Sequence, residues 1–164
     1  MSFNLGFPGE KFSGLAFDKK YTLAVGVENT IELWDVRQMS EPRLSFNGHE
    51  RVSKAIDFSP SDSKKIVTGG GSNDKKLLLW DTTSGTILAH VETESKICGV
   101  HWINQHGFFS TNGAGSGPVS CWSKDGGTLI KEQTSPKSTE QTLCSVQNPR
   151  EPSAIVTASS AENL

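Results

Sequence analysis

The segment Lys76-Leu-Leu-Leu-Trp-Asp-Thr-Thr-Ser-Gly85 decides how this sequence folds. A short apolar run ends at Trp80-Asp81 and is followed by turn residues, which is typical of a β-strand that leads into a tight turn. Similar runs end at Trp34-Asp35 and at Trp122-Ser123, 46 residues before and 42 residues after Trp80. Self-similarity at a period of about 40–45 residues predicts a chain built from repeated supersecondary units.

Each unit reads as four short strands. In the unit around Trp80 we expect strands near 52–58, 65–70, 76–81 and 87–92, separated by turns rich in Ser, Asn, Asp and Gly. Apolar residues tend to alternate along these strands, and no stretch has a helical period. The sequence therefore predicts an all-β fold.

Four residues of this unit stand where a WD repeat places a hydrogen-bonded tetrad, and one of them is the histidine of the dipeptide Gly48-His49. Resemblance to that repeat implies that an Asp caps the imidazole of a loop His, which bridges to a strand hydroxyl and an indole N–H. The residues are His49, Thr68, Asp74 and Trp80. A catalytic triad of His49, Asp74 and Thr68 is the alternative. The repeat explains all four residues together, so we interpret them as structural and expect no enzyme.

The resemblance to WD repeats predicts a partial β-propeller of about three and a half four-stranded blades, in a single domain over 1–164. We expect blades at about 12–47, 52–92 and 97–133, and an incomplete blade at 141–164. Propellers close with 4–8 blades, so such a set leaves apolar faces at both ends without a neighbour. We expect a chain that is unstable alone, a fragment of a longer gene product, or a chain completed by association.

Composition excludes several kinds of partner. The net charge is −2, and Lys and Arg are scattered among Asp and Glu, so the sequence predicts neither a nucleic-acid partner nor a membrane partner. The first residues lack the features of a signal peptide. An odd set of three cysteines without paired spacing fits a reducing intracellular compartment, in the nucleus and/or cytoplasm.

Neither a cofactor nor a metal is expected. The triple glycine Gly69–Gly71 follows a strand but lacks the Gly-Lys-Ser/Thr ending and the helix of a phosphate-binding loop. No His or Cys pair has zinc-ligand spacing. We therefore expect Cys98, Cys121 and Cys144 to be small buried hydrophobes.

A more specific pattern lies in five segments of the chain. They are Val52-Ser-Lys-Ala-Ile-Asp-Phe-Ser-Pro60, Thr68-Gly-Gly-Gly-Ser-Asn-Asp74, Lys76-Leu-Leu-Leu-Trp-Asp-Thr-Thr-Ser-Gly85, Thr93-Glu-Ser-Lys-Ile-Cys-Gly-Val-His-Trp102 and Ser110-Thr-Asn-Gly113. The chain resembles the Fizzy and Fizzy-related activators of the anaphase-promoting complex over about residues 12–164. By this resemblance it looks like the C-terminal half of that propeller, its fourth to seventh blades.

The Fizzy resemblance implies a protein-binding module that recruits substrates to a ubiquitin ligase in cell-cycle control. The partners would be degron-bearing proteins and subunits of the anaphase-promoting complex. Asn29 and Ser72 match family positions that contact a Lys-Glu-Asn degron, whereas Val27 replaces a second family asparagine. A generic WD-repeat scaffold or a non-functional truncated propeller remains the alternative.

Overall fold

The computed structural model describes residues 12–50, 55–113, 117–125, 128–135 and 139–160 of the chain. Every regular element in these residues is a β-strand, which confirms the all-β prediction. Within the described part of the chain, no helix has the length and apolar character needed to cross a membrane.

The strands form successive antiparallel meanders, which are the blades of a propeller. The first blade contains β1 (Phe12–Phe17), β2 (Thr22–Val27), β3 (Thr30–Asp35) and β4 (Leu44–Asn47). The second contains β5 (Ala55–Phe58), β6 (Lys65–Gly69), β7 (Lys76–Asp81) and β8 (Ile87–Glu92). The third contains β9 (Ile97–Trp102), β10 (Gly107–Asn112), β11 (Val119–Asp125) and β12 (Thr128–Thr134).

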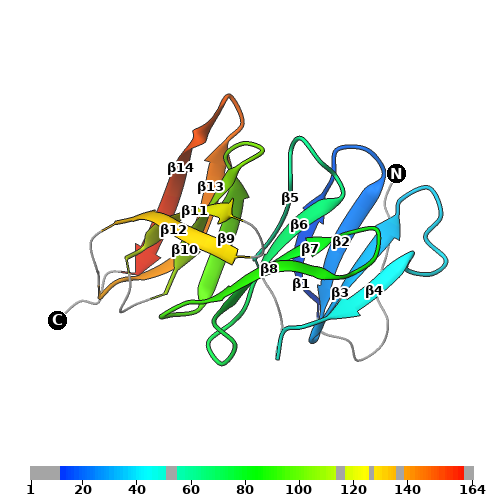
Figure 1. The fold of residues 1–164 in the computed structure, drawn as a ribbon, viewed down its shortest axis with the longest axis horizontal. Helices are drawn as coiled ribbons and strands as arrows, with labels where there is room; N and C mark the ends of the chain where they lie inside the picture. The colour runs from blue at the N-terminus through cyan, green and yellow to red at the C-terminus, as the bar shows by residue number, and fades with distance from the viewer. Residues whose placement is uncertain (1–11, 51–54, 114–116, 126–127, 136–138, 161–164) are drawn as a thin grey trace.

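A fourth blade is represented by two paired strands, β13 (Gln141–Asn148) and β14 (Glu151–Ser160). Figure 1 shows the blades following one another in chain order, from β1–β4 on the right to β13–β14 on the left. The first strands of successive blades are neighbours, because β5 contacts both β1 and β9, and β9 contacts β13. These innermost strands therefore surround a common axis, as the propeller prediction requires.

The second and third blades are not separate four-stranded sheets. Thr128 of β12 pairs with His90 of β8 in a parallel bridge, so the second and third blades form one continuous eight-stranded sheet. Both strands are the outermost of their blades. This bridge depends on how two blades approach at their outer edge, which the pattern of a single blade does not encode.

The hydrophobic core lies between blades. One cluster joins β2, β3 and β4 of the first blade to β5, β6 and β7 of the second, and in it the rings of Phe46 and Trp80 lie 4.7 Å apart. A second cluster joins the second blade to the third, where Val67 and Leu79 pack with Trp102 and Trp122. The tryptophan on the third strand of each of these two blades therefore faces the preceding blade, and each sheet packs on its neighbour.

The prediction that all three cysteines are buried is wrong. Cys98 and Cys121 are half-buried, and Cys144 is exposed. Cys144 shares a sheet face with its paired residue Ala158 and with Val146, and no strand in the described residues covers that face. Exposure at this position thus reflects the lack of a covering strand among the described residues and not the residue type.

We expect Leu79→Ala to destabilise the chain by about 2–5 kcal/mol, because Leu79 is 1% exposed and its loss leaves a cavity between two blades. Ile130→Ala is the matched control, since Ile130 is 40% exposed on β12. We expect it to change the free energy of unfolding by less than about 1 kcal/mol. Urea titration followed by tryptophan fluorescence measures both, and equal losses would contradict a core located between the blades.

Candidate functional site

The side chains predicted as a tetrad form one continuous hydrogen-bonded chain in the second blade. Trp80 Nε1 donates to Thr68 Oγ1 over 2.8 Å, and Thr68 Oγ1 lies 2.6 Å from His49 Nε2. His49 Nδ1 contacts Asp74 Oδ2 at hydrogen-bonding distance. The chain runs from the third strand of the blade, through the second, to the β4–β5 connection and the β6–β7 turn.

The donor order fixes the protonation of His49. Thr68 Oγ1 accepts the indole N–H, so its own hydrogen is available for Nε2, and the proton on Nδ1 is donated to the Asp74 carboxylate. Burial lowers the pKa of His49 below its ordinary value, although the hydrogen bond to Asp74 opposes this shift. The imidazole is thus neutral at pH 7.

The four side chains are enclosed, as a structural clasp requires. Thr68 is 0% exposed and His49 is 4% exposed, so no substrate atom can approach the hydroxyl. The free oxygen of Asp74, Oδ1, has no hydrogen-bond partner in the described residues, but Lys76 Nζ lies 3.7 Å away. The same ammonium lies 3.5 Å from Glu50 Oε1. Its positive charge therefore lies close to two carboxylates at the edge of the clasp.

The triple glycine has a packing role. A Cβ atom on Gly70 would overlap the Asp74 carboxylate, and one on Gly69 would overlap Ile97 of the next blade. On Gly48 it would lie 2.6 Å from the indole ring of Trp80. Neither Gly69 nor Gly70 is among the residues with positive φ. Glycine is thus required here for close approach and not for an unusual backbone.

The first blade replaces the clasp by a local bond. Trp34 Nε1 donates to Glu32 Oε2 over 2.9 Å. Trp34 pairs with Leu23 as Trp80 pairs with Ile66, which puts Val25 at the position of Thr68. Without a hydroxyl at that position, the indole N–H finds its acceptor on its own strand. Glu28, which aligns with Asp74 in sequence, is exposed in the β2–β3 turn with φ 50°.

The third blade keeps the hydroxyl and changes the rest. Trp122 Nε1 donates to Ser110 Oγ over 2.8 Å, and Ser110 in turn donates to Asn112 Oδ1. The Asn112 amide then donates to Gly117 O and Ser120 Oγ. An amide two residues along the strand therefore takes over from the loop His. Ser116, the residue aligned with Asp74, lies outside the described residues.

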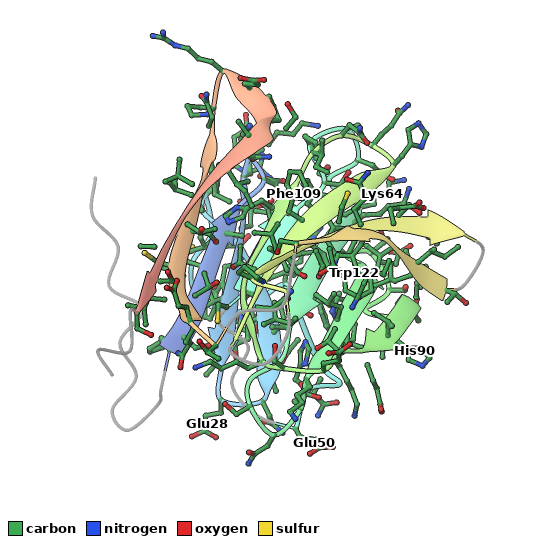
Figure 2. The ribbon with its side chains drawn as sticks, turned by 90° about the vertical axis from the view of Figure 1, so that its left-hand side faces the viewer. Glu28, Glu50, Lys64, His90, Phe109 and Trp122 are labelled. Atoms are coloured by element: carbon green, nitrogen blue, oxygen red, sulfur yellow. The ribbon has the colours of Figure 1, made fainter. Side chains whose placement is uncertain are left out.

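The residues predicted to contact a degron lie at the same end of the propeller as the clasp. We call this the tetrad end; it carries the β2–β3 and β6–β7 turns and the β4–β5 connection. Asn29 and Ser72 are exposed in those two turns. Figure 2 shows the two ends, with Glu28 and Glu50 at the tetrad end and Lys64 at the opposite one.

Ser72 lines an open depression of about 360 Å³ at the tetrad end. The other lining residues come from the turns and connections of the second and third blades and the start of the fourth: Lys75, Glu94, Ser95, Lys96, Gly113 and Gln141. Asn29 is not among them, so the structure does not bring the two predicted residues into one cavity. Val27 is 5% exposed and packs with Val25 and Trp34, so its side chain belongs to the apolar packing of the first blade.

Comparisons with known proteins agree with this geometry. A chain in the crystal structure of the mitotic checkpoint complex matches with a TM-score of 0.79 and 27% identity, over 90% of this chain and 46% of that one. The WD repeat-containing protein slp1 of Schizosaccharomyces pombe is 29% identical over 85% of this chain. This chain is a segment of a WD-repeat β-propeller. No protein-family description matches it.

The propeller segment resembles the Fizzy type of WD-repeat protein. The APC/C activator protein CDC20 of Saccharomyces cerevisiae is 33% identical over 54% of the segment, and FIZZY-RELATED 3 of Arabidopsis thaliana is 29% identical over 64%. The segment spans less than a third of these relatives, covering 28% of slp1, 22% of FIZZY-RELATED 3 and 14% of CDC20.

Sequence reasoning missed Asp57, which joins the second and third blades at the opposite end. Asp57 Oδ2 accepts the backbone N–H of Trp102 over 2.9 Å, and Trp102 Nε1 donates to the Asp57 carbonyl over 3.2 Å. Burial raises the pKa of Asp57 to about 6, although the Trp102 hydrogen bond opposes the shift. No sequence signal marks Asp57, because its partner lies 45 residues away in another blade.

We expect Thr68→Val to lower the free energy of unfolding by about 2–4 kcal/mol, because it leaves the Trp80 N–H and His49 Nε2 buried without their partner. Thr157→Val is the matched control: Thr157 pairs with Ser145 as Thr68 pairs with Ile56, but it is exposed. We expect it to change stability by less than about 0.5 kcal/mol. Equal effects of the two substitutions in denaturant titrations would refute the structural role of the clasp.

We expect Asp57→Asn to remove a pH-dependent loss of stability. The pKa of Asp57 is about 6 in the folded chain, above the ordinary value of 3.8, so the folded state holds the proton more tightly and loses stability as pH rises between these values. The stability of the variant relative to the parent should therefore rise between pH 4 and pH 7, by up to about 3 kcal/mol. Parallel stability curves for the two proteins would contradict a raised pKa.

Proposed function

We propose that this propeller segment is a protein-binding module of the substrate-adaptor type, and that its tetrad end binds degron peptides. The likeness to slp1 over 85% of the chain and to the APC/C activator CDC20 supports this proposal. Its partners are then degron-bearing proteins and subunits of the anaphase-promoting complex, and it acts in the nucleus and/or cytoplasm. The relatives bear the names of WD-repeat activators, so we propose binding and not catalysis as the activity.

The chemistry of the tetrad end suits a short polar peptide. Ser72 and Asn29 each offer both a donor and an acceptor to a ligand amide or carboxylate. The depression beside Ser72 is lined by Lys75, Lys96 and Glu94, so charges of both signs face one small space. A peptide such as Lys-Glu-Asn, which carries one cation, one anion and one amide, complements that set of groups.

Fluorescence anisotropy with a labelled Lys-Glu-Asn peptide tests the proposal. We expect Asn29→Ala and Ser72→Ala to weaken binding by about 2–10-fold each, because each removes a hydrogen bond of about 0.5–1.5 kcal/mol. Gln105→Ala and Ser61→Ala are the controls, since each removes a similar exposed polar group at the opposite end. We expect both to bind as the parent does.

A peptide with the same residues in scrambled order controls for charge alone. Absence of binding, or binding that neither tetrad-end substitution weakens, would contradict the degron site and favour a scaffold with unrelated partners. Circular dichroism of each variant verifies that the blades still form.

A further inference from the structure

The backbone of Trp102 is bound by two side chains from the neighbouring blades. β9 pairs only with β10 and ends its sheet, so its other edge is free of strands in the described residues. On that edge Asp57 Oδ2 accepts the N–H of Trp102 over 2.9 Å, and Gln147 Nε2 donates to the Trp102 carbonyl. Side chains from β5 and β13 therefore converge on one residue of the third blade, and each of the three residues lies inside a described strand.

A cavity of about 280 Å³ lies at this point, at the end of the propeller that Lys64 marks in Figure 2. It is lined by residues at or next to the ends of the innermost strands: Phe17, Phe58, Trp102 and Gln147. Pockets for drug-sized molecules begin at about 300 Å³. The cavity therefore has room for one long side chain and not for a larger ligand.

The polar groups that are fixed at this cavity are acceptors. Gln147 Nε2 also donates to Pro152 O over 2.7 Å, so both amide hydrogens are used and Gln147 can offer only its carbonyl oxygen to a ligand. Asp57 offers its carboxyl group. Burial raises the pKa of Asp57 to about 6, so most of this carboxyl is ionised at pH 7. A ligand must therefore supply donors and positive charge.

The charge of Asp57 is not balanced by an ion pair. Among the described residues, no lysine, arginine or histidine forms a salt bridge with it. Lys19 and Lys20 also line the cavity, but both are exposed on the β1–β2 turn, and Lys19 attracts the carboxylate only through its charge. Asp18, from the same turn, uses Oδ1 to accept backbone N–H groups of that turn. A cation bound beside Asp57 would offset the cost of its burial.

We propose that this cavity binds an arginine side chain of a partner protein. A guanidinium group carries five donors in a planar fork, so it can donate to the Asp57 carboxylate and to Gln147 Oε1 together. Its methylene stem packs against the apolar lining of Phe58, Pro60 and Trp102. A lysine ammonium is a compact point charge and matches two separate acceptors less well. The site is distinct from the proposed peptide site, which lies at the tetrad end.

NMR titration of the ¹⁵N-labelled chain with N-acetyl-arginine amide tests the site. We expect saturable shifts at the backbone N–H of Trp102 and the side-chain amide of Gln147. N-acetyl-citrulline amide has a similar shape without the charge, and it should bind at least about tenfold more weakly. N-acetyl-lysine amide should bind several-fold more weakly than the arginine probe.

Three outcomes of this titration would overturn the proposal. The first is the absence of a saturable shift at Trp102. The second is equal affinity for the arginine and citrulline probes, which would mean that the carboxylate takes no part. The third is a lysine probe that binds as tightly as the arginine probe, which would remove the role of the guanidinium fork.

Substitutions test which carboxylate holds the ligand. Asp57→Asn should weaken binding of the arginine probe at least about tenfold, while its amide oxygen still accepts the Trp102 N–H. Asp62→Asn is the matched control at the same end, because Asp62 pairs with Lys65 over 3.0 Å and does not line the cavity. It should bind as the parent does. Lys19→Met should bind the probe several-fold more tightly, because a like charge near Asp57 is removed.

Circular dichroism of each variant verifies that the blades form. Unchanged binding by folded Asp57→Asn would contradict the site, as would weaker binding by folded Lys19→Met. A merely structural role of Asp57 predicts neither the loss in the first variant nor the gain in the second.

Discussion

Every blade of this protein depends on a neighbour to bury its apolar faces. The two larger clusters of buried apolar residues, around Trp80 and around Trp102 and Trp122, each join residues from two blades, and the small cluster around Trp34 lies on the first blade. The exposure of Leu15 and Val156 shows what happens where a neighbour is absent from the described residues. The proposed peptide site is tied to this constraint, because the turns at the tetrad end keep their positions only while the blades are stacked.

Polar bonds supplement that packing, and they differ from blade to blade. The second blade has the full chain from Trp80 to Asp74, the third retains an indole-to-serine bond completed by Asn112, and the first uses Glu32. In all three, the buried indole N–H finds an acceptor. Satisfying this one donor is therefore the shared requirement, and the full clasp is one of several solutions.

The fold was predictable because its signals are local and repeated. Tryptophan spacing and alternating apolar residues indicate strands and blades without knowledge of any long-range contact. Residue types in one unit likewise pointed to His49, Thr68, Asp74 and Trp80 as a group. Contacts between blades left no such signal. Asp57 accepts a hydrogen bond from a backbone N–H in the next blade, and Cys144 is exposed because no strand among the described residues covers its face. Asn29 does not line the depression beside Ser72. The two residues belong to different blades, and no local pattern encodes how the blades are arranged.

Amide hydrogen exchange resolved by strand tests the stacking account most directly. The second blade has described neighbours on both faces, so the account predicts that β6 and β7 exchange most slowly. The two-stranded fourth blade has an unpaired outer edge in the described residues, and β14 should exchange much faster. Protection of β14 equal to that of β6 and β7 would contradict the account, because it would mean that a blade holds its structure without its neighbours.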